Sequence, residues 1–287
     1  MPEAVDVYYR SDDGLKLYAY DYNTAGPDAP VLLCLHGLTR NSSDFTRLAS
    51  DLSPRYRIIC ADQRGRGRSD YDSNPANYQP VTYVRDMFAL LDHLQLPRVI
   101  VIGTSMGGLM GMMMGAMQPQ RIAGLLLNDI GPEVDPAGLA RIQSYVGKSR
   151  PVRNWEEALA QSQAINGAAF PDFSPGQWRD FTRGLYRNVD GVPVLAYDPA
   201  IAQPIDAAQE NAVPPDLWPL FDSLNLPVLV VRGAESDILA PTTAAAMCER
   251  GHDCQLQEIP RRGHAPTLDE PAARQAIGRW LQSLGAA

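Results

Sequence analysis

Val99-Ile100-Val101-Ile102-Gly103-Thr104-Ser105-Met106-Gly107-Gly108 is the stretch on which the interpretation of the whole chain depends. Four apolar residues that favour a β-strand lead into the pattern G-x-S-x-G and then into a Met- and Gly-rich run that can form a helix. Glycine at 103 and 107 leaves room for a sharp turn, which would hold Ser105 in a strained conformation with its hydroxyl exposed. A strand before and a helix after this pattern indicate a nucleophilic serine. Ser105 is therefore predicted as a nucleophile, provided that a base and an oxyanion hole are found elsewhere.

The composition is typical of a soluble globular protein. A chain of 287 residues can form one large domain, or a core with a sizeable insertion. The net charge of -8 and the pI near 5.0 argue against nucleic acid or an anionic membrane as a partner. The first ten residues lack the basic and apolar regions of a secretory signal. We expect a cytoplasmic protein with neither a nucleic-acid partner nor a membrane partner.

Two features of the chain could be mistaken for other kinds of structure. The run Val99–Met117 is uncharged and long enough to resemble a membrane span, but its glycines favour a buried strand followed by a buried helix. The four cysteines do not form a disulfide framework in a chain of this length. Cys34 and Cys60 lie in apolar strand patterns and are predicted as core residues. Cys248 and Cys254 could meet across a turn, but we favour free thiols.

Strand patterns alternate with helical patterns along most of the chain. The predicted strands are Val5–Tyr9, Leu15–Tyr22, Val31–Leu35, Tyr56–Ala61, Arg98–Ile102, Ala123–Asn128, Pro227–Val231 and Gln255–Ile259. The predicted helices include Thr82–Leu94, Thr242–Arg250 and Pro271–Leu284. The first two strands form an antiparallel hairpin, and the others form a mostly parallel sheet with helices on both faces, which is an α/β fold.

Residues 131–219 interrupt this alternation. Prolines and glycines become frequent, apolar strand patterns are missing, and the alternation resumes only after Pro214-Pro215 and Pro219. Short helical stretches there carry the aromatic residues Tyr145, Trp155, Phe170, Phe173, Trp178, Phe181 and Tyr186. The segment is predicted as a mostly helical module that covers Ser105.

Four motifs, taken together, give the chain a resemblance to a known family. They are His36-Gly37-Leu38 after a strand, the D-x-R-G-x-G-x-S string Asp62–Ser69, the turn at Ser105, and Asp237 followed by His264. The chain resembles the α/β-hydrolase fold family. The resemblance implies a mostly parallel eight-stranded sheet with helices on both faces. It also implies a core domain of residues 1–130 and 220–287 with an inserted helical cap domain at residues 131–219.

A serine nucleophile needs a base, and His264 is the favoured candidate among four histidines. It follows a strand and a turn, so it lies where active-site groups of open α/β sheets gather. His36 is in the loop expected to shape the oxyanion hole, His93 is late in a helix, and His252 is in a charged turn. The order Ser, Asp, His that the resemblance implies selects His264.

Asp237 is the favoured acid to orient this histidine, because it follows a strand where the family's acid usually stands. It could instead be a loop carboxylate that caps the next helix. Glu235 is a weaker candidate in the same loop, and Asp129 is the alternative acid after the sixth strand.

The oxyanion hole is predicted from the backbone N–H groups of Leu38 and Met106. Met106 follows the nucleophile, and Leu38 lies in a loop that Gly37 allows to approach closely. The Asp62–Ser69 string is interpreted as structural, with Asp62 and Arg64 tying loops together beside the site.

These residues predict a serine hydrolase that cleaves carboxylic esters, of the carboxylesterase or lactonase type, through an acyl-enzyme on Ser105. The partner is a small-molecule ester or lactone, and a homodimer is compatible with the sequence. We expect no cofactor and no metal, since His, Cys and carboxylate residues do not occur at ligand spacing.

Three alternatives stay open. A C–C bond hydrolase of the aromatic meta-cleavage type has the same triad, but its relatives usually have Trp after the histidine, where this chain has Ala265. A cofactor-free perhydrolase and a non-catalytic ligand receptor on the same scaffold are the other two.

Overall fold

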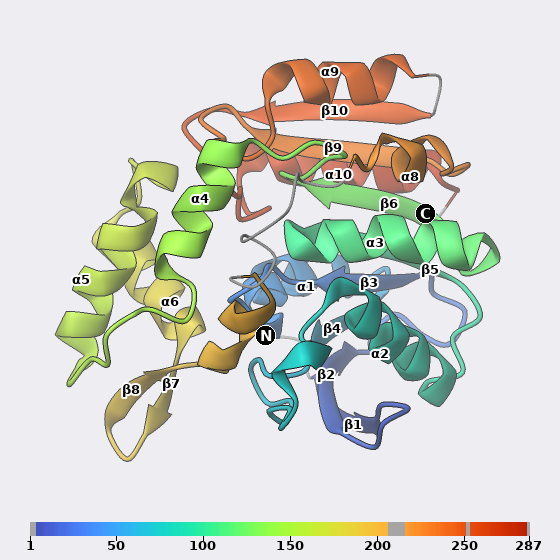
Figure 1. Ribbon diagram of the computed structural model, residues 1–287. Coiled ribbons are helices and arrows are strands. Elements are labelled where there is room, and N and C mark those ends of the chain that lie inside the picture. Colours follow the sequence, from blue (N-terminus) through green and yellow to red (C-terminus); the bar gives the residue numbers. More distant parts are fainter. Residues whose placement is uncertain (1–3, 206–215, 251–252, 286–287) are drawn as a thin grey trace.

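The computed structural model describes residues 4–205, 216–250 and 253–285, and within them one sheet has eight strands in the order β1-β2-β4-β3-β5-β6-β9-β10 (Figure 1). These strands are β1 Val5–Arg10, β2 Lys16–Tyr22, β3 Val31–Leu35, β4 Arg57–Asp62, β5 Val99–Thr104, β6 Ile122–Asn128, β9 Val228–Gly233 and β10 Cys254–Ile259. Strand β2 is antiparallel to β1 and β4, and the remaining neighbours pair in parallel. The predicted α/β class and the mostly parallel eight-stranded sheet are confirmed.

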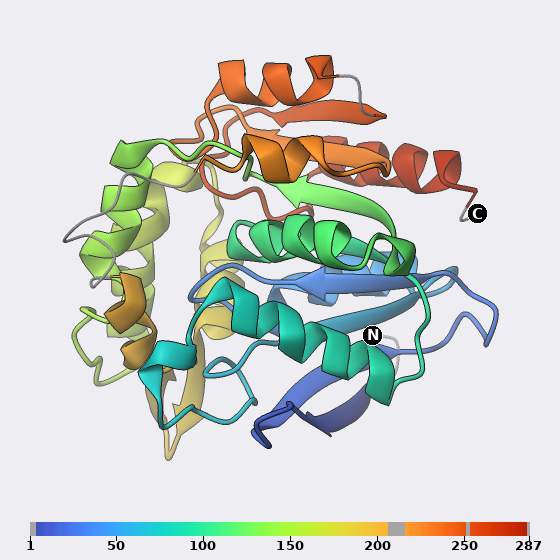
Figure 2. The same ribbon diagram turned by 45° about the vertical axis from the view of Figure 1, so that its right-hand side comes forward.

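Helices cover both faces of the sheet because neighbouring residues of each buried strand point to opposite sides (Figures 1 and 2). Leu33 and Val101 pack in the half of the core that α2, α3, α8 and α9 cover, and Leu32 and Ile102 pack in the half that α1 and α10 cover. The bounds are α1 Thr46–Leu52, α2 Pro80–His93, α3 Met106–Met117, α8 Trp218–Asp222, α9 Pro241–Glu249 and α10 Pro271–Ser283. Short 3-10 helices are η1 Ser42–Phe45, η2 Pro75–Asn77, η3 Pro119–Arg121, η4 Gly167–Ala169 and η5 Pro199–Ala202.

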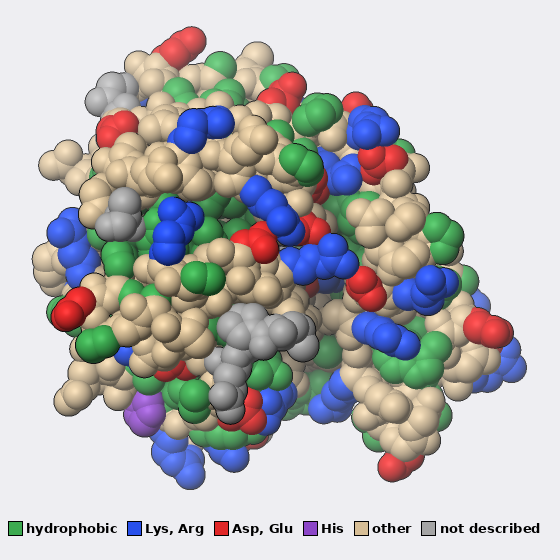
Figure 3. Space-filling view, turned by 180° about the vertical axis from the view of Figure 1, so that it is seen from behind, with side chains coloured by type: hydrophobic (Ala, Val, Ile, Leu, Met, Phe, Trp, Pro, Cys, Tyr) green, Lys and Arg blue, Asp and Glu red, His purple; other side chains and the backbone are tan. Residues whose placement is uncertain are grey.

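The interpretation of Val99–Met117 as a strand and a helix is correct, since β5 and α3 occupy this run. No helix in the described part of the chain is long and apolar enough to cross a membrane. Cys34 and Cys60 are buried core residues, as predicted. On the face drawn in Figure 3, acidic and basic side chains are intermingled, so this face carries both signs of charge.

Residues 131–205, which we call the inserted segment, lie beyond the carboxyl ends of the parallel strands (Figure 1). Their elements are α4 Pro136–Tyr145, α5 Trp155–Asn166, α6 Pro175–Leu185, β7 Tyr186–Val189 and β8 Val192–Leu195. The chain leaves the sheet edge and returns to it at one place: the Leu217 N–H donates to the Pro132 carbonyl at 3.3 Å, and the Trp218 indole N–H donates to Glu133 at 2.7 Å. Pro214-Pro215 lies outside the described residues.

The expectation of a segment without strands is wrong in one place, because β7 and β8 form an antiparallel hairpin. Asp190 and Gly191 connect the two strands with φ angles of 50° and 88°. Positive φ at both positions is typical of a tight hairpin turn, and Asp-Gly favours it. The flanking residues are mostly polar or exposed, so the apolar alternation of a strand was weak.

Candidate active site

Ser105 lies on a sharp turn between β5 and α3, as the sequence predicted. Its φ and ψ are 52° and -117°, a conformation that is strained for a residue with a side chain. A Cβ atom at Gly103 would overlap the Gly107 carbonyl, and one at Gly107 would overlap the Leu35 carbonyl. The two glycines therefore allow strand and helix to approach closely enough to form the turn.

His264 follows β10 and contacts the serine directly. Its Nε2 is 2.8 Å from the Ser105 Oγ, and its Nδ1 is 2.9 Å from an oxygen of the Asp129 carboxylate. The Asn128 amide donates to the Pro266 carbonyl at 2.8 Å and so holds the loop that carries this histidine. Three side chains from three strand ends thus form one hydrogen-bonded series.

Asp129 follows β6 and is fully buried. One of its oxygens accepts the Gly233 N–H at 2.8 Å, and the other accepts the Ser236 hydroxyl at 2.6 Å as well as facing His264. A carboxylate accepts the N–H on Nδ1, which leaves Nε2 unprotonated to accept the serine proton. Asp129 therefore has the position from which an acid orients a catalytic histidine.

The preference for Asp237 is corrected by this geometry. Both oxygens of Asp237 accept hydrogen bonds from Arg141 of α4, and the described contacts of His264 are with Ser105 and Asp129. Burial raises the pKa of Asp237, but the Arg141 guanidinium outweighs it and the net shift is downward. Asp237 links the inserted segment to the β9–α9 loop and does not orient His264.

His36 supports the loop expected to form one side of the oxyanion hole. It is completely buried, and burial lowers its pKa to about 3, so the ring is neutral. Its Nε2 accepts the Gln63 N–H at 3.1 Å, which places the proton on Nδ1, where it is donated to the Gly37 carbonyl at 2.7 Å. The Cβ position at Gly37 is 3.7 Å from the Ser105 Cβ, so this loop lies against the nucleophile.

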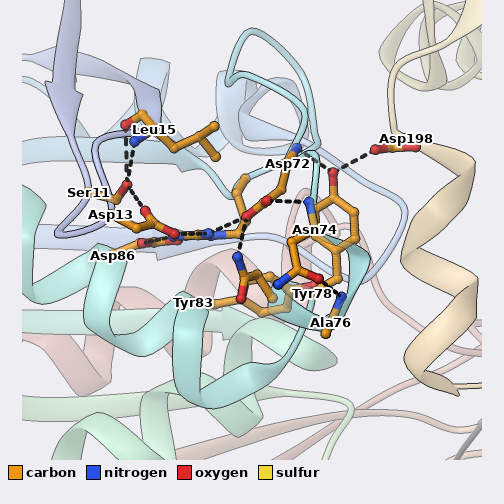
Figure 4. Close-up of polar contacts among 12 residues, drawn as sticks. Ser11, Asp13, Leu15, Asp72, Asn74, Ala76, Tyr78, Tyr83, Asp86 and Asp198 are labelled. Carbon is orange, nitrogen blue, oxygen red and sulfur yellow. Dashed lines mark hydrogen bonds and ion pairs between the residues drawn. The ribbon is translucent and has the colours of Figure 1, made fainter.

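The Asp62–Ser69 string ties loops together beside the site. Asp62 accepts the Ser42 N–H at 2.7 Å and the Arg68 N–H at 2.8 Å, and its own carbonyl accepts the Ser69 hydroxyl at 2.6 Å. Arg64 is buried and forms ion pairs with Asp13, Asp72 and Asp86. Figure 4 shows the side chains of these three carboxylates near one another. These contacts agree with the structural role predicted for Asp62 and Arg64.

A cavity of about 730 Å³ opens above Ser105 and His264, and Leu38 also lines it. Much of its far wall is aromatic: Phe170, Phe173 and Phe181 of the inserted segment line it. The rings of Phe170 and Phe173 stack with centroids 4.4 Å apart. Polar and charged side chains, among them Arg40, Asp44 and Arg183, line it as well. A concave cavity of this volume that combines apolar and polar groups is typical of a site for a small organic molecule.

Several residues that hold this site were not predicted from the sequence. Asn128 and Ser236 position the histidine loop and Asp129, and Arg141 pairs with Asp237. A polar pair at the end of a buried strand, Asn128-Asp129, is a sequence signal that favours Asp129 as a site residue. His93 is exposed near the end of α2, and His252 lies outside the described residues.

A family model described as "Alpha/beta hydrolase family" matches residues 32–276. The chain belongs to this family. A curated relative from Cupriavidus necator, described as a 3-hydroxybutyrate-oligomer hydrolase, is 40% identical over 270 residues, which cover 91% of this chain and 92% of the relative. A 3-oxoadipate enol-lactonase from Acinetobacter baylyi is 28% identical and matches 89% of this chain and 90% of its own length.

A solved structure agrees with this assignment. An alpha/beta hydrolase from Novosphingobium aromaticivorans superposes with a TM-score of 0.92 at 43% identity, covering 100% of both chains. The curated relatives also include an esterase from Mycobacterium tuberculosis, so hydrolase activity is supported at the level of the family.

Proposed function

We propose that the protein is a serine hydrolase that cleaves carboxylic esters, with Ser105, His264 and Asp129 as its catalytic triad. The observation that carries this proposal is the hydrogen-bonded series at the floor of the cavity, with 2.8 Å from Ser105 Oγ to His264 Nε2 and 2.9 Å from Nδ1 to Asp129. A serine hydroxyl becomes nucleophilic when such a base accepts its proton.

In the proposed reaction, Ser105 Oγ attacks the ester carbonyl carbon while His264 takes the hydroxyl proton. The carbonyl oxygen becomes an oxyanion bound by the N–H groups of Leu38 and Met106. The N–H of Met106, the first residue of α3, has no acceptor within the helix, which leaves it available for this role. His264 then protonates the leaving alcohol, and a water molecule activated by His264 hydrolyses the acyl-enzyme.

The proposed substrate is a short linear ester of a hydroxy acid, such as a 3-hydroxybutyrate dimer or trimer. This proposal is supported by the relative from Cupriavidus necator, which aligns over nearly its whole length. The cavity volume and the aromatic wall suit an aliphatic chain that carries ester groups.

We also propose that residues 131–219 act as a cap domain over a core of residues 1–130 and 220–287. The cap supplies the aromatic wall, and the core supplies the reacting groups. In this arrangement the cap excludes water and selects the acyl or alcohol chain, without contributing a group that reacts.

The test compares the wild type with Ser105→Ala. Both are assayed with p-nitrophenyl esters of graded chain length, 3-hydroxybutyrate oligomers, a lactone and a ring-cleavage dienoate. We expect the wild type to favour the oligomers and to be labelled covalently by a fluorophosphonate. Loss of the nucleophile should lower kcat by about 10⁴- to 10⁶-fold and abolish labelling. Labelling that persists in Ser105→Ala would contradict the assignment, and preferred cleavage of the dienoate would favour a C–C bond hydrolase.

A further inference from the structure

The string Arg64-Gly65-Arg66-Gly67-Arg68 contains three arginines in very different surroundings. Arg64 has three carboxylate partners, as described above, and Arg68 is half-exposed and pairs with Asp6. Arg66 is completely buried, and within the described part of the chain it has no carboxylate partner. Burying a guanidinium without a counter-charge costs stability, so Arg66 is a candidate for a functional role.

The contacts of Arg66 lead to the predicted oxyanion hole. Its Nε donates to the Leu38 carbonyl at 2.9 Å, and its Nη2 is 3.9 Å from the Met106 sulfur. These are the two residues whose N–H groups are proposed to bind the oxyanion. One buried side chain therefore contacts both halves of that site, although the two halves come from the loop after β3 and from the start of α3.

The rest of the guanidinium is held firmly in place. Its Nη1 donates to the Arg64 carbonyl at 2.8 Å and to the Tyr83 hydroxyl at 2.9 Å. Its central carbon lies 4.8 Å from the centre of the Tyr83 ring and 5.6 Å from the centre of the Tyr78 ring. Both rings can therefore form cation–π interactions with the guanidinium. The Tyr78 hydroxyl is fixed in turn by donating to Asp198 at 2.6 Å (Figure 4).

The charge of Arg66 also reaches the loop that carries Leu38. Burial is the main reason for the low pKa of His36, and the positive charge of Arg66 adds to it. The positive charge of Arg66 disfavours a positive charge on His36, and it therefore favours a negative charge beside the same loop. The negative charge of the reaction develops on the substrate oxygen, between Leu38 and Met106.

We propose that Arg66 is a positioning residue for ester cleavage: it aligns Leu38 and Met106 as oxyanion donors, and its unpaired charge favours the oxyanion. This inference rests on the proposed serine mechanism. An electrostatic contribution of this kind is preorganised, because the charge and its hydrogen bonds are in place before the substrate arrives.

The test replaces Arg66 with Met and with Lys, and uses Arg68→Met as a matched control that removes the third arginine of the same string. Each variant is titrated with a fluorophosphonate so that rates refer to folded active sites. Two inhibitors distinguish stabilisation of the oxyanion from binding of the ground state. Ser105 adds to an aliphatic trifluoromethyl ketone to form an oxyanion, whereas the matching methyl ketone reports ground-state binding. The substrate is p-nitrophenyl acetate.

For Arg66→Met we expect kcat to fall by about 10- to 100-fold, less than or comparable to the loss of one oxyanion donor, with little change in KM. The affinity for the trifluoromethyl ketone should fall by the same factor, while that for the methyl ketone should not change. Arg66→Lys should recover part of the loss because it keeps the charge. Arg68→Met should match the wild type in kcat, in KM and in its affinity for each of the two ketones.

Tyr83→Phe keeps the proposal testable if Arg66→Met does not fold, because it removes one hydrogen bond from Arg66 with little change in volume. A parallel loss of kcat and of trifluoromethyl ketone affinity supports the proposal. Variants that change only the Tm, with both quantities as in the wild type, overturn it. If the wild type neither cleaves esters nor binds the trifluoromethyl ketone, the serine mechanism itself fails and this inference falls with it.

Discussion

The floor and the far wall of the cavity are held by different kinds of interaction. On the floor, Ser105, His264 and Asp129 are fixed by hydrogen bonds of 2.6 to 2.9 Å from backbone and side-chain groups. On the wall, Phe170 and Phe181 pack ring against ring, with centroids 5.2 Å apart. Hydrogen bonds are directional and permit one arrangement, whereas apolar contacts tolerate several. The floor is therefore suited to chemistry and the wall to selectivity.

The strongest test of this difference is the acid on the floor. Asp129→Asn should lower kcat by about 10⁴-fold, because the amide can stabilise the wrong tautomer of His264. KM should change little, since the wall is untouched. The kinetic constants for p-nitrophenyl acetate, with circular dichroism as a check on folding, measure this effect. A loss below tenfold in a folded variant would show that Asp129 is not the acid.

A second test concerns the stability of the floor in acid. The pKa of His36 is about 3 in the folded protein, compared with an ordinary value of 6.5. The unfolded chain therefore binds a proton below pH 6.5 that the folded protein excludes. The free energy of unfolding should fall with decreasing pH, and this residue should contribute up to about 1.4 kcal/mol per pH unit.

Urea denaturation between pH 7 and pH 4.5 measures this slope. His36→Asn should show a shallower dependence on pH than the wild type, because the group that titrates in the unfolded state is gone. His93→Asn is the matched control, since it removes an exposed histidine and keeps the buried His36. Identical slopes for the wild type and His36→Asn would mean that other groups dominate the acid response.

The wall should respond in KM and in chain-length preference. Phe181 lines the cavity and Trp155 does not, although both belong to the inserted segment. Phe181→Ala should raise KM for a medium-chain p-nitrophenyl ester by about tenfold and leave the acetate nearly unchanged, because only the longer chain reaches the lost ring. Trp155→Ala controls for loosening of the segment. Destruction of acetate hydrolysis by Phe181→Ala would place catalytic groups on the wall.

The smallest effect is expected for the ion pair between Asp237 and Arg141, which joins the floor of the cavity to the inserted segment. Asp237 and Arg141 are 41% and 35% exposed, so their pairing should contribute at most about 1 kcal/mol. Asp237→Asn should change kcat by no more than about threefold, as expected for a contact that does not orient His264. Measuring this variant beside Asp129→Asn decides between the two acids. If the order of their effects is reversed, Asp237 is the acid.

The sequence predicted the floor better than the wall, for a physical reason. The residues of the floor come after apolar runs such as Val31–Leu35 and Val99–Ile102, and burial of both faces gives these strands a strong sequence pattern. Glycines at 103 and 107 mark the turn between Val99–Ile102 and α3. The wall is made of short helices and a polar hairpin whose faces are only partly buried, so its pattern is weak.

The choice of acid shows a different limit. Asp129 and Asp237 both follow parallel strands that are neighbours in the sheet, so local sequence places both near the edge. The difference between them lies in tertiary contacts. The carboxylate of Asp237 accepts hydrogen bonds from Arg141, which is 96 residues away. Hydrogen bonds from Gly233 and Ser236 orient Asp129 toward His264. A single sequence carries no signal of such distant partners.

The hydrogen bond between Leu217 and Pro132 has a consequence for how such a protein can diversify. The chain departs from the sheet edge and comes back to it within the reach of one hydrogen bond, so the two ends of the excursion lie side by side. Segments with closely spaced ends can be lengthened, shortened or exchanged without disturbing the scaffold that carries them. A segment of different length or shape could therefore be attached at the same two ends without moving the strands that carry Ser105, Asp129 and His264.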